Sequence, residues 1–211
     1  MTNLNHPDFN SPKKSLILLF SFSLIFLLAA NSIAQNLSNE LLNYNRDRID
    51  LNKSAMLVLS GWAIGNIAVG SYGFLSGSGR TKYFHQMNAA WNVVNISIGA
   101  FAYYQYLHSN PSDFNLLQSI NEARSIENIL LLNIGLNVGY IATGAFLWER
   151  GIRKDHSRLL GYGPSLIMQG GFLLVFDSVI YALNKSQNEK MFNLLEKVTL
   201  SYNSLSVSIP L

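Results

Sequence analysis

One acidic residue, Asp177, lies well inside an apolar stretch of this 211-residue chain, about six residues from its end. An ionisable residue at membrane depth is a functional hypothesis by default, because a charge in hydrocarbon is costly. Asp177 could carry a proton or pair with a basic group. The structural alternative is a hydrogen-bonded acid that fixes helix packing. Gln169 lies eight residues earlier, roughly on the same face of a helix.

Amides form the second polar set. The i, i+4, i+7 spacing of Asn88, Asn92 and Asn95 places them on one helical face, and Asn133 and Asn137 share another. Buried amides need partners, so we expect them to face inward, either bonding between helices or forming a pocket for a ligand head group. The predicted ligand-binding residues are Asn88, Asn92, Asn95, Gln169 and Asp177.

A glycine-rich basic loop, residues 77–82, precedes a second apolar stretch and lacks the spacing of a P-loop. Its position before a helix favours anions, and basic loops also set membrane topology without binding anything. The residues predicted to contact anionic lipid head groups are Arg80, Lys82, Arg150, Arg153, Lys154 and Arg158.

The sequence contains few residues or motifs that would serve metal binding or nucleophilic catalysis. His85 and His156 lie in the two basic loops, but no His-Glu-x-x-His spacing, cysteine or Gly-x-Ser-x-Gly elbow is present. We therefore predict no metal, cofactor or catalytic residue, and an intramembrane enzyme using Asp177 or the histidines is the least favoured alternative. Basic residues do not alternate with aromatics as on a nucleic-acid surface, so no nucleic-acid partner is expected.

The elements that would position these residues are hydrophobic. Charged residues make up 13% of the chain, against about 25% in soluble domains. Four apolar stretches approach the ~20 residues that cross a bilayer: Ala55–Leu75, Asn88–Leu107, Asn128–Trp148 and Tyr162–Leu183. In lipid, only helices satisfy their backbone groups segment by segment. The predicted fold is all-α, a four-helix transmembrane bundle over residues 55–183.

The bundle contains a weak internal repeat, because Met56–Ser76 aligns with Leu130–Arg150 and their glycines coincide. Small residues let membrane helices approach closely. We therefore expect two repeated helical hairpins, with the first and third helices touching along Gly61, Gly65, Gly70, Gly135, Gly139 and Gly144.

The N-terminus is typical of a secretory signal. Lys13 and Lys14 precede an apolar run that ends at Ser32-Ile33-Ala34, so residues 1–34 are predicted to be a signal peptide. An uncleaved helix is the alternative. Basic residues collect in loops 76–87 and 149–161, which predicts that these loops are cytoplasmic and that both mature termini lie outside a bacterial inner membrane.

Two flanking segments complete the organisation. Residues 35–54 are predicted to be an extracytoplasmic amphipathic segment, with Tyr44 and Ile49 lying on the membrane surface. Residues 184–211 are predicted to be an extracytoplasmic tail with a short helix near Glu189–Val198. Alternating apolar residues on either side of Asn203-Ser204 then suggest a β-hairpin.

Three stretches, Gly77–Asn95, Trp148–Arg150 and Gly161–Asp177, resemble an uncharacterised bacterial family of small membrane proteins, with a signal peptide and a four-span domain of unknown function. The resemblance covers about 55–185 and implies no activity or site residue. The predicted function is non-enzymatic binding of a lipid, small molecule or protein partner in the membrane. The alternative is a small transporter of repeated two-helix units using Asp177, with homo-oligomerisation left open.

Overall fold

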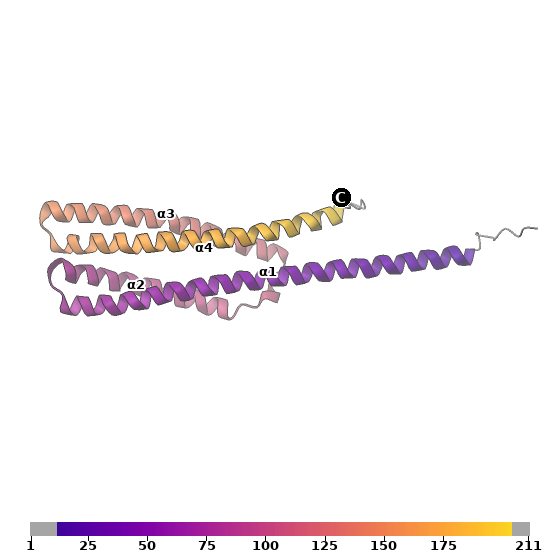
Figure 1. The fold of residues 1–211 in the computed structure, drawn as a ribbon, viewed down its shortest axis with the longest axis horizontal. Helices are drawn as coiled ribbons and strands as arrows, with labels where there is room; N and C mark the ends of the chain where they lie inside the picture. Colours follow the sequence, from indigo (N-terminus) through magenta and orange to yellow (C-terminus); the bar gives the residue numbers. More distant parts are fainter. Residues whose placement is uncertain (1–11, 204–211) are drawn as a thin grey trace, which may run out of the picture. The chain divides into compact units, whose positions relative to one another are not determined.

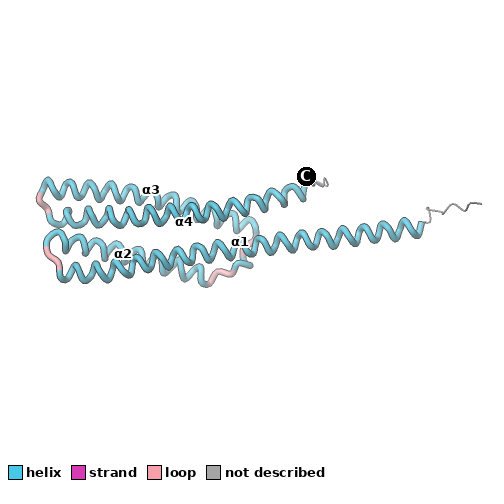
Figure 2. Tube along the Cα trace, in the orientation of Figure 1, coloured by secondary structure: helices cyan, strands magenta, loops and turns pink. Residues whose placement is uncertain are grey.

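The structure, a computed structural model, describes the chain from residue 12 to residue 203. It consists of helices α1 (Pro12–Ser76), α2 (Gly79–Leu107), α3 (Leu116–Lys154) and α4 (Ser157–Asn203), with a short 3-10 helix, η1 (Pro111–Asp113) (Figures 1 and 2). Two compact units are distinguished, residues 1–41 and 42–211. From residue 12, the first unit is the helical beginning of α1, and the predicted signal peptide within it stays a prediction. The second unit contains the bundle.

Short turns join the long helices into two hairpins whose turns lie at one end of the bundle (Figure 2). The α1–α2 turn ends at Gly79, whose φ of +51° favours glycine. The α3–α4 turn passes through Asp155 in the left-handed region. Between the hairpins, a capping box starts α3, because Asn115 and Gln118 each accept the other's backbone N–H at 2.9 Å. We call the end with the two hairpin turns the turn end.

The sequence repeat is visible in how each hairpin packs. A Cβ added to Gly70 would lie 2.9 Å from the Cβ of Ala89, and one added to Gly144 would lie 2.7 Å from the carbonyl oxygen of Gly163. Gly144 and Gly163 stand at the positions equivalent to Gly70 and Ala89, each 74 residues further along the chain. The repeat therefore marks the close contact within each hairpin.

The expected glycine contact between α1 and α3 is wrong. A Cβ added to Gly61, Gly65, Gly135 or Gly139 would meet nothing within 4 Å, and all four glycines are exposed. The remaining two, at positions 70 and 144, do pack closely, but against α2 and α4. The repeated glycines therefore do not join the two hairpins.

The physical reason is that, among the described side chains, the α1–α3 contacts that can be identified lie toward the end away from the turns. There, Asn45 accepts a hydrogen bond from Ser119 at 2.8 Å, and one core cluster combines residues of both helices with Phe176 and Ile180 of α4. Near the turns, α2 and α4 approach each other instead. A Cβ added to Gly161 of α4 would lie 2.5 Å from the carbonyl oxygen of Arg80 on α2. The unpacked glycine pairs lie beyond the region where α1 and α3 touch.

Within the part of the chain that the structure describes, three helical segments are long and apolar enough to cross a membrane, not the four predicted: Gln35–Ser76, Leu116–Lys154 and Ser157–Phe192. Helix α2 falls short because Asn88, Asn92 and Asn95 lower its mean hydropathy. These three asparagines are nevertheless buried, while Val93, Val94 and Ile98 beside them are more than half exposed. Helix α2 thus turns its polar face inward and its apolar face outward.

The predicted C-terminal β-hairpin is also wrong in its first strand. Residues 198–202 belong to α4, which also absorbs the predicted short helix Glu189–Val198. A helix satisfies its own backbone hydrogen bonds, whereas an isolated strand needs a partner for them. The second predicted strand, residues 205–209, lies outside the described part of the chain.

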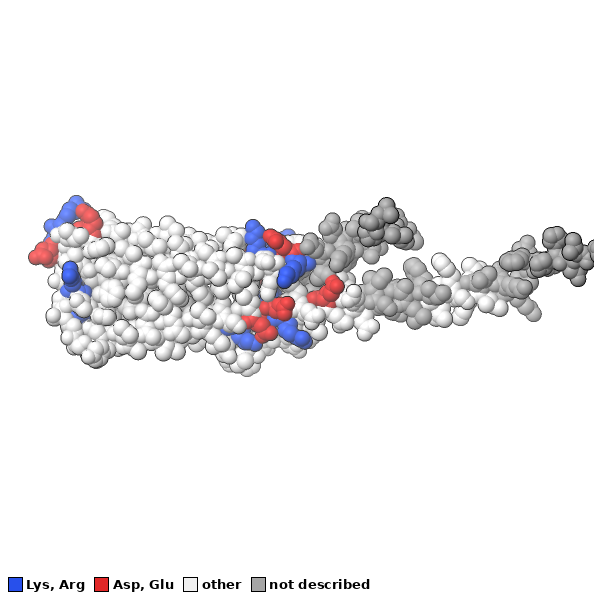
Figure 3. Space-filling model, in the orientation of Figure 1, with Lys and Arg blue, Asp and Glu red and all other residues white. Residues whose placement is uncertain are grey.

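The interior of the second unit is unusually polar. Of the eight largest fully buried side chains in the described chain, all but Met191 are polar, and four are asparagines. The exposed surface carries large apolar side chains such as Tyr72, Leu75 and Phe101, each at least 67% exposed. On the face shown in Figure 3, charged side chains gather at the two ends of this unit and leave the band between them uncharged. This arrangement suits lipid, where outward apolar groups cost nothing.

Candidate functional site

A ladder of buried amides, which we call the amide ladder, crosses the middle of the bundle with Asn88 as its hub. The Asn88 amide donates to the side-chain oxygen of Asn66 on α1 at 3.0 Å, and the Asn88 side-chain oxygen accepts from Gln169 on α4. Gln169 in turn accepts from the Trp62 indole at 3.1 Å, and the Trp62 ring stacks on Phe172 at 3.9 Å. Three helices are therefore tied together through one asparagine.

The ladder continues along α2. Asn92 donates to the Asn88 carbonyl oxygen at 2.8 Å, and Asn95 donates to the Asn92 side-chain oxygen at 3.3 Å. These contacts agree with the inward orientation expected from the spacing. They use the amides for hydrogen bonds within and between helices, and the predicted binding of a ligand by these amides stays a prediction.

Asp177 belongs to a separate polar pair. The Oδ2 atom of its carboxyl group accepts a hydrogen bond from the Asn137 amide of α3 at 2.7 Å, and the exposed fraction of Asp177 is 7%. Gln169, which was expected to share a site with Asp177, instead bonds to α2 and α1. The predicted ligand-binding set is therefore divided between the amide ladder and the Asn137–Asp177 pair.

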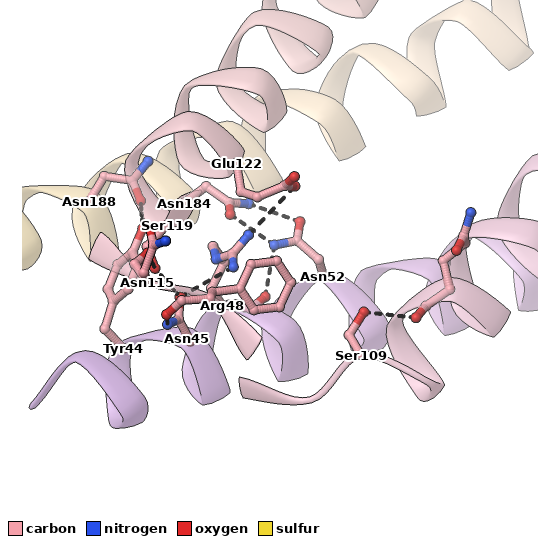
Figure 4. Close-up of polar contacts among 12 residues, drawn as sticks. Tyr44, Asn45, Arg48, Asn52, Ser109, Asn115, Ser119, Glu122, Asn184 and Asn188 are labelled. Carbon is pink, nitrogen blue, oxygen red and sulfur yellow. Dashed lines mark hydrogen bonds and ion pairs between the residues drawn. The ribbon is translucent and has the colours of Figure 1, made fainter. Parts of the chain in front are cut away.

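A third polar cluster lies at the end away from the turns, where side chains of α1, α3 and α4 converge, among them Tyr44, Arg48, Glu122 and Asn184, while Ser109 lies apart (Figure 4). Tyr44 donates to Asn188 at 2.5 Å. Asn52 and Asn184 exchange hydrogen bonds of 2.9 and 3.2 Å. Tyr44 and Ile49 are buried, so they do not lie on the membrane surface as the sequence suggested.

A buried arginine stands at the centre of this cluster, which we call the Arg48 cluster. Arg48 is 2% exposed, donates to Asn45 at 3.2 Å and lies 4.8 Å from the ring centre of Phe114. Its ion pair with the half-exposed Glu122 is long, at 3.8 Å. This cluster was not predicted from the sequence, although the i, i+3, i+7 spacing of Asn45, Arg48 and Asn52 places them on one helical face.

An open cleft of about 350 Å³ lies at the turn end, between the start of α2, the end of α3 and the start of α4. Its lining combines one cation and one hydroxyl with apolar and aromatic surface: Arg80, Thr81, Phe84, Trp148, Leu160 and Pro164. Ser78 makes no side-chain cap on α2, and the first backbone bond is donated by Lys82 to Ser78 at 3.3 Å. The N–H groups before Lys82 therefore have no acceptor inside the helix, and such groups favour anions.

The six basic residues predicted to contact head groups are not equivalent. Arg153 pairs with Glu149, and Lys82 lies 5.0 Å from the ring centre of Phe74. Arg158 donates to the Tyr162 hydroxyl at 3.3 Å. Arg150 and Lys154 lie at the exposed end of α3, with Arg150 6.0 Å from the ring centre of Phe146. Of the six, Arg80 lines the cleft, and head-group binding by the set stays a prediction.

The histidines do not converge. The His85 ring packs against Gly73 inside the first hairpin, whereas His156 is exposed in the second turn. Among the residues that the structure describes, no three His, Asp or Glu side chains are grouped so that they could hold a metal ion.

Comparison with known proteins connects these features to one family. Residues 58–178, more than half of the chain, match the model of a family of unknown function, DUF6992. The match contains the amide ladder, the Asn137–Asp177 pair and the cleft, but stops short of Tyr44, Arg48 and Asn184 in the Arg48 cluster. No curated protein and no solved structure matches the chain. The chain belongs to the DUF6992 family of unknown function.

Proposed function

We propose that this protein is a non-enzymatic integral membrane protein that binds the anionic head group of a phospholipid in the cleft at its turn end. The observation that carries the proposal is the composition of the cleft. Arg80 and Thr81 supply a cation and a hydroxyl, and Phe84, Leu160 and Trp148 supply apolar wall. A phospholipid presents the same two chemistries next to each other, a charged phosphate and an acyl chain.

The position of the cleft also favours a lipid ligand. The cleft lies at the boundary between the charged turns and the apolar helices, where head groups meet hydrocarbon. Trp148 is 46% exposed there, and tryptophan is enriched at this depth because its ring is amphipathic. The N–H groups at the start of α2, which have no acceptor inside the helix, would favour a phosphate bound there.

Membrane insertion of α2 is part of the proposal. Three of the described segments are apolar enough to cross alone, and α2 lies beside two of them, contacting α1 near Gly70 and α4 near Gly161. Its 29 residues span about 43 Å at ~1.5 Å per residue, which exceeds the ~30 Å hydrocarbon core. We propose that α2 crosses with its neighbours, in a bacterial inner membrane with the basic turns on the cytoplasmic side.

Native mass spectrometry of the full chain released from lipid nanodiscs tests the proposal. Phosphatidylglycerol and phosphatidylcholine are supplied together, and the retained lipid is identified. We expect retention of phosphatidylglycerol, and a roughly fivefold weaker retention in Arg80→Gln, since a basic residue at the surface contributes about 1 kcal/mol with anionic lipid.

Arg124→Gln is the matched control, because it removes the same charge from an exposed position on α3 at the far end of the bundle. Equal retention of the two lipids, or equal loss in both variants, would refute the head-group site. Free phosphate is added in a separate arm. If it displaces the lipid completely, the site recognises phosphate alone and the apolar wall has no role.

Transport through the bundle is the second candidate, and Asp177 in the interior is the observation that favours it. Proton-coupled flux into vesicles, compared between the native chain and Asp177→Asn, tests this candidate. Unchanged flux would remove Asp177 from any such mechanism.

A further inference from the structure

The four apolar stretches defined from the sequence contain a single charged residue, Asp177. No Lys, Arg, His or Glu and no other Asp occurs within Ala55–Leu75, Asn88–Leu107, Asn128–Trp148 or Tyr162–Leu183. The titratable groups that these stretches contribute besides Asp177 are tyrosines: Tyr72, Tyr103, Tyr104, Tyr106, Tyr140, Tyr162 and Tyr181. A negative charge on Asp177 would therefore have no cation facing it from α1, α2, α3 or its own helix within these stretches.

The surroundings of Asp177 also offer little to stabilise a negative charge. It is 7% exposed and lies six residues from Leu183, which is about 9 Å along the helix at ~1.5 Å per residue. The ion pairs among the described side chains lie elsewhere, at Arg48–Glu122, Lys53–Asp50 and Arg153–Glu149. One amide donor, from Asn137, is its hydrogen-bond partner. One neutral hydrogen bond offsets little of the cost of a charge at this depth.

We propose that the Asn137–Asp177 pair is a proton-binding site, in which Asp177 is a neutral carboxylic acid at neutral pH in the bilayer. The acid keeps a carbonyl oxygen that accepts from the Asn137 amide, so the 2.7 Å hydrogen bond remains when the proton is bound. Ionisation would place an unpaired charge between α3 and α4 and draw water into their contact. The site goes beyond lipid binding, because it lies in the interior of the bundle, away from the cleft.

Infrared spectroscopy of the full chain in lipid nanodiscs tests the proposal, with the proton itself as the probe. A carboxylic acid has a C=O stretching band that a carboxylate lacks. We expect this band at neutral pH in the native chain, its loss in Asp177→Asn and its retention in Asp155→Asn. Asp155 is the matched control because it is exposed and adopts a left-handed conformation that asparagine tolerates.

Asn137→Leu gives an independent arm, because removing the amide donor should shift the C=O band without abolishing it. This arm decides the question if Asp177→Asn does not fold, which circular dichroism and size-exclusion chromatography would reveal. Absence of the band in the native chain, or its persistence in Asp177→Asn, would overturn the proposal. Loss of the band when sodium chloride replaces choline chloride would also overturn it, because Asp177 would then bind a metal cation.

Discussion

Two glycines of α3, five residues apart, should respond oppositely to the same substitution. In Gly144→Ala the new Cβ would lie 2.7 Å from the Gly163 carbonyl oxygen and 2.9 Å from the Ile167 backbone nitrogen, so α3 and α4 must separate. In Gly139→Ala it would meet nothing within 4 Å. Both variants gain the same helix propensity, about 1 kcal/mol, and this gain cancels in their difference. Overpacking should therefore make Gly144→Ala less stable than Gly139→Ala by about 1–3 kcal/mol of unfolding free energy. This difference is roughly a 5- to 150-fold change in the unfolding equilibrium.

The assay is unfolding of the full chain by sodium dodecyl sulfate in mixed micelles, followed by circular dichroism. The repeat supplies a second matched pair, Gly70→Ala and Gly65→Ala, because a Cβ on Gly70 would lie 2.9 Å from the Ala89 backbone nitrogen. Gly144→Ala and Gly70→Ala should unfold at lower detergent fractions than their partners. Equal destabilisation by Gly139→Ala and Gly144→Ala would refute the reasoning and restore the contact between the glycine pairs of α1 and α3.

Four further outcomes can be measured by the same titration. Asn88→Leu should cost about 0.6–1.7 kcal/mol for each interhelical hydrogen bond that it removes, since Asn88 joins three helices. Asn52→Leu should lower the free energy of unfolding by about 1–3 kcal/mol, because it leaves the buried Asn184 amide without its reciprocal partner. Glu122→Gln should change the free energy of unfolding by less than about 1 kcal/mol, because Glu122 is half exposed. Asn115→Ala should cost about 1 kcal/mol by removing the capping box of α3, and a loss below 0.3 kcal/mol would contradict that role of the cap.

Local signals in the sequence located the two hairpins and the inward face of α2, but not the full lengths of the helices. The predicted loops 76–87 and 149–161 contain the hairpin turns, yet the structure leaves only residues 77–78 and 155–156 of these loops outside helices. The i, i+4, i+7 spacing of asparagines predicted a buried face, and all three are buried. These properties follow from periodicity along one helix, which does not depend on what the helix packs against.

The partners of each helix were harder to predict. A Gly-x-x-x-Gly pair makes one face of a helix smooth, but lipid can cover that face as well as protein can, so Gly61 and Gly65 did not identify a neighbour. The Arg48 cluster was missed for a related reason. A charged residue between polar ones suggests a surface facing water, whereas here Phe114 and Glu122, both more than 60 positions later, lie against the Arg48 side chain.

The polar interior explains why α2 belongs to the bundle although it is less apolar than the other helices. Alone in lipid, α2 would expose the amides of Asn88, Asn92 and Asn95, and each unsatisfied polar group there costs several kcal/mol. In the bundle, Asn88 bonds to α1 and α4, and Asn92 and Asn95 bond to α2 itself. Asn88, one of the amides that lower the hydropathy of α2, therefore holds this helix between its neighbours. That attachment also fixes the start of α2, and with it Arg80, at the mouth of the cleft beside α4.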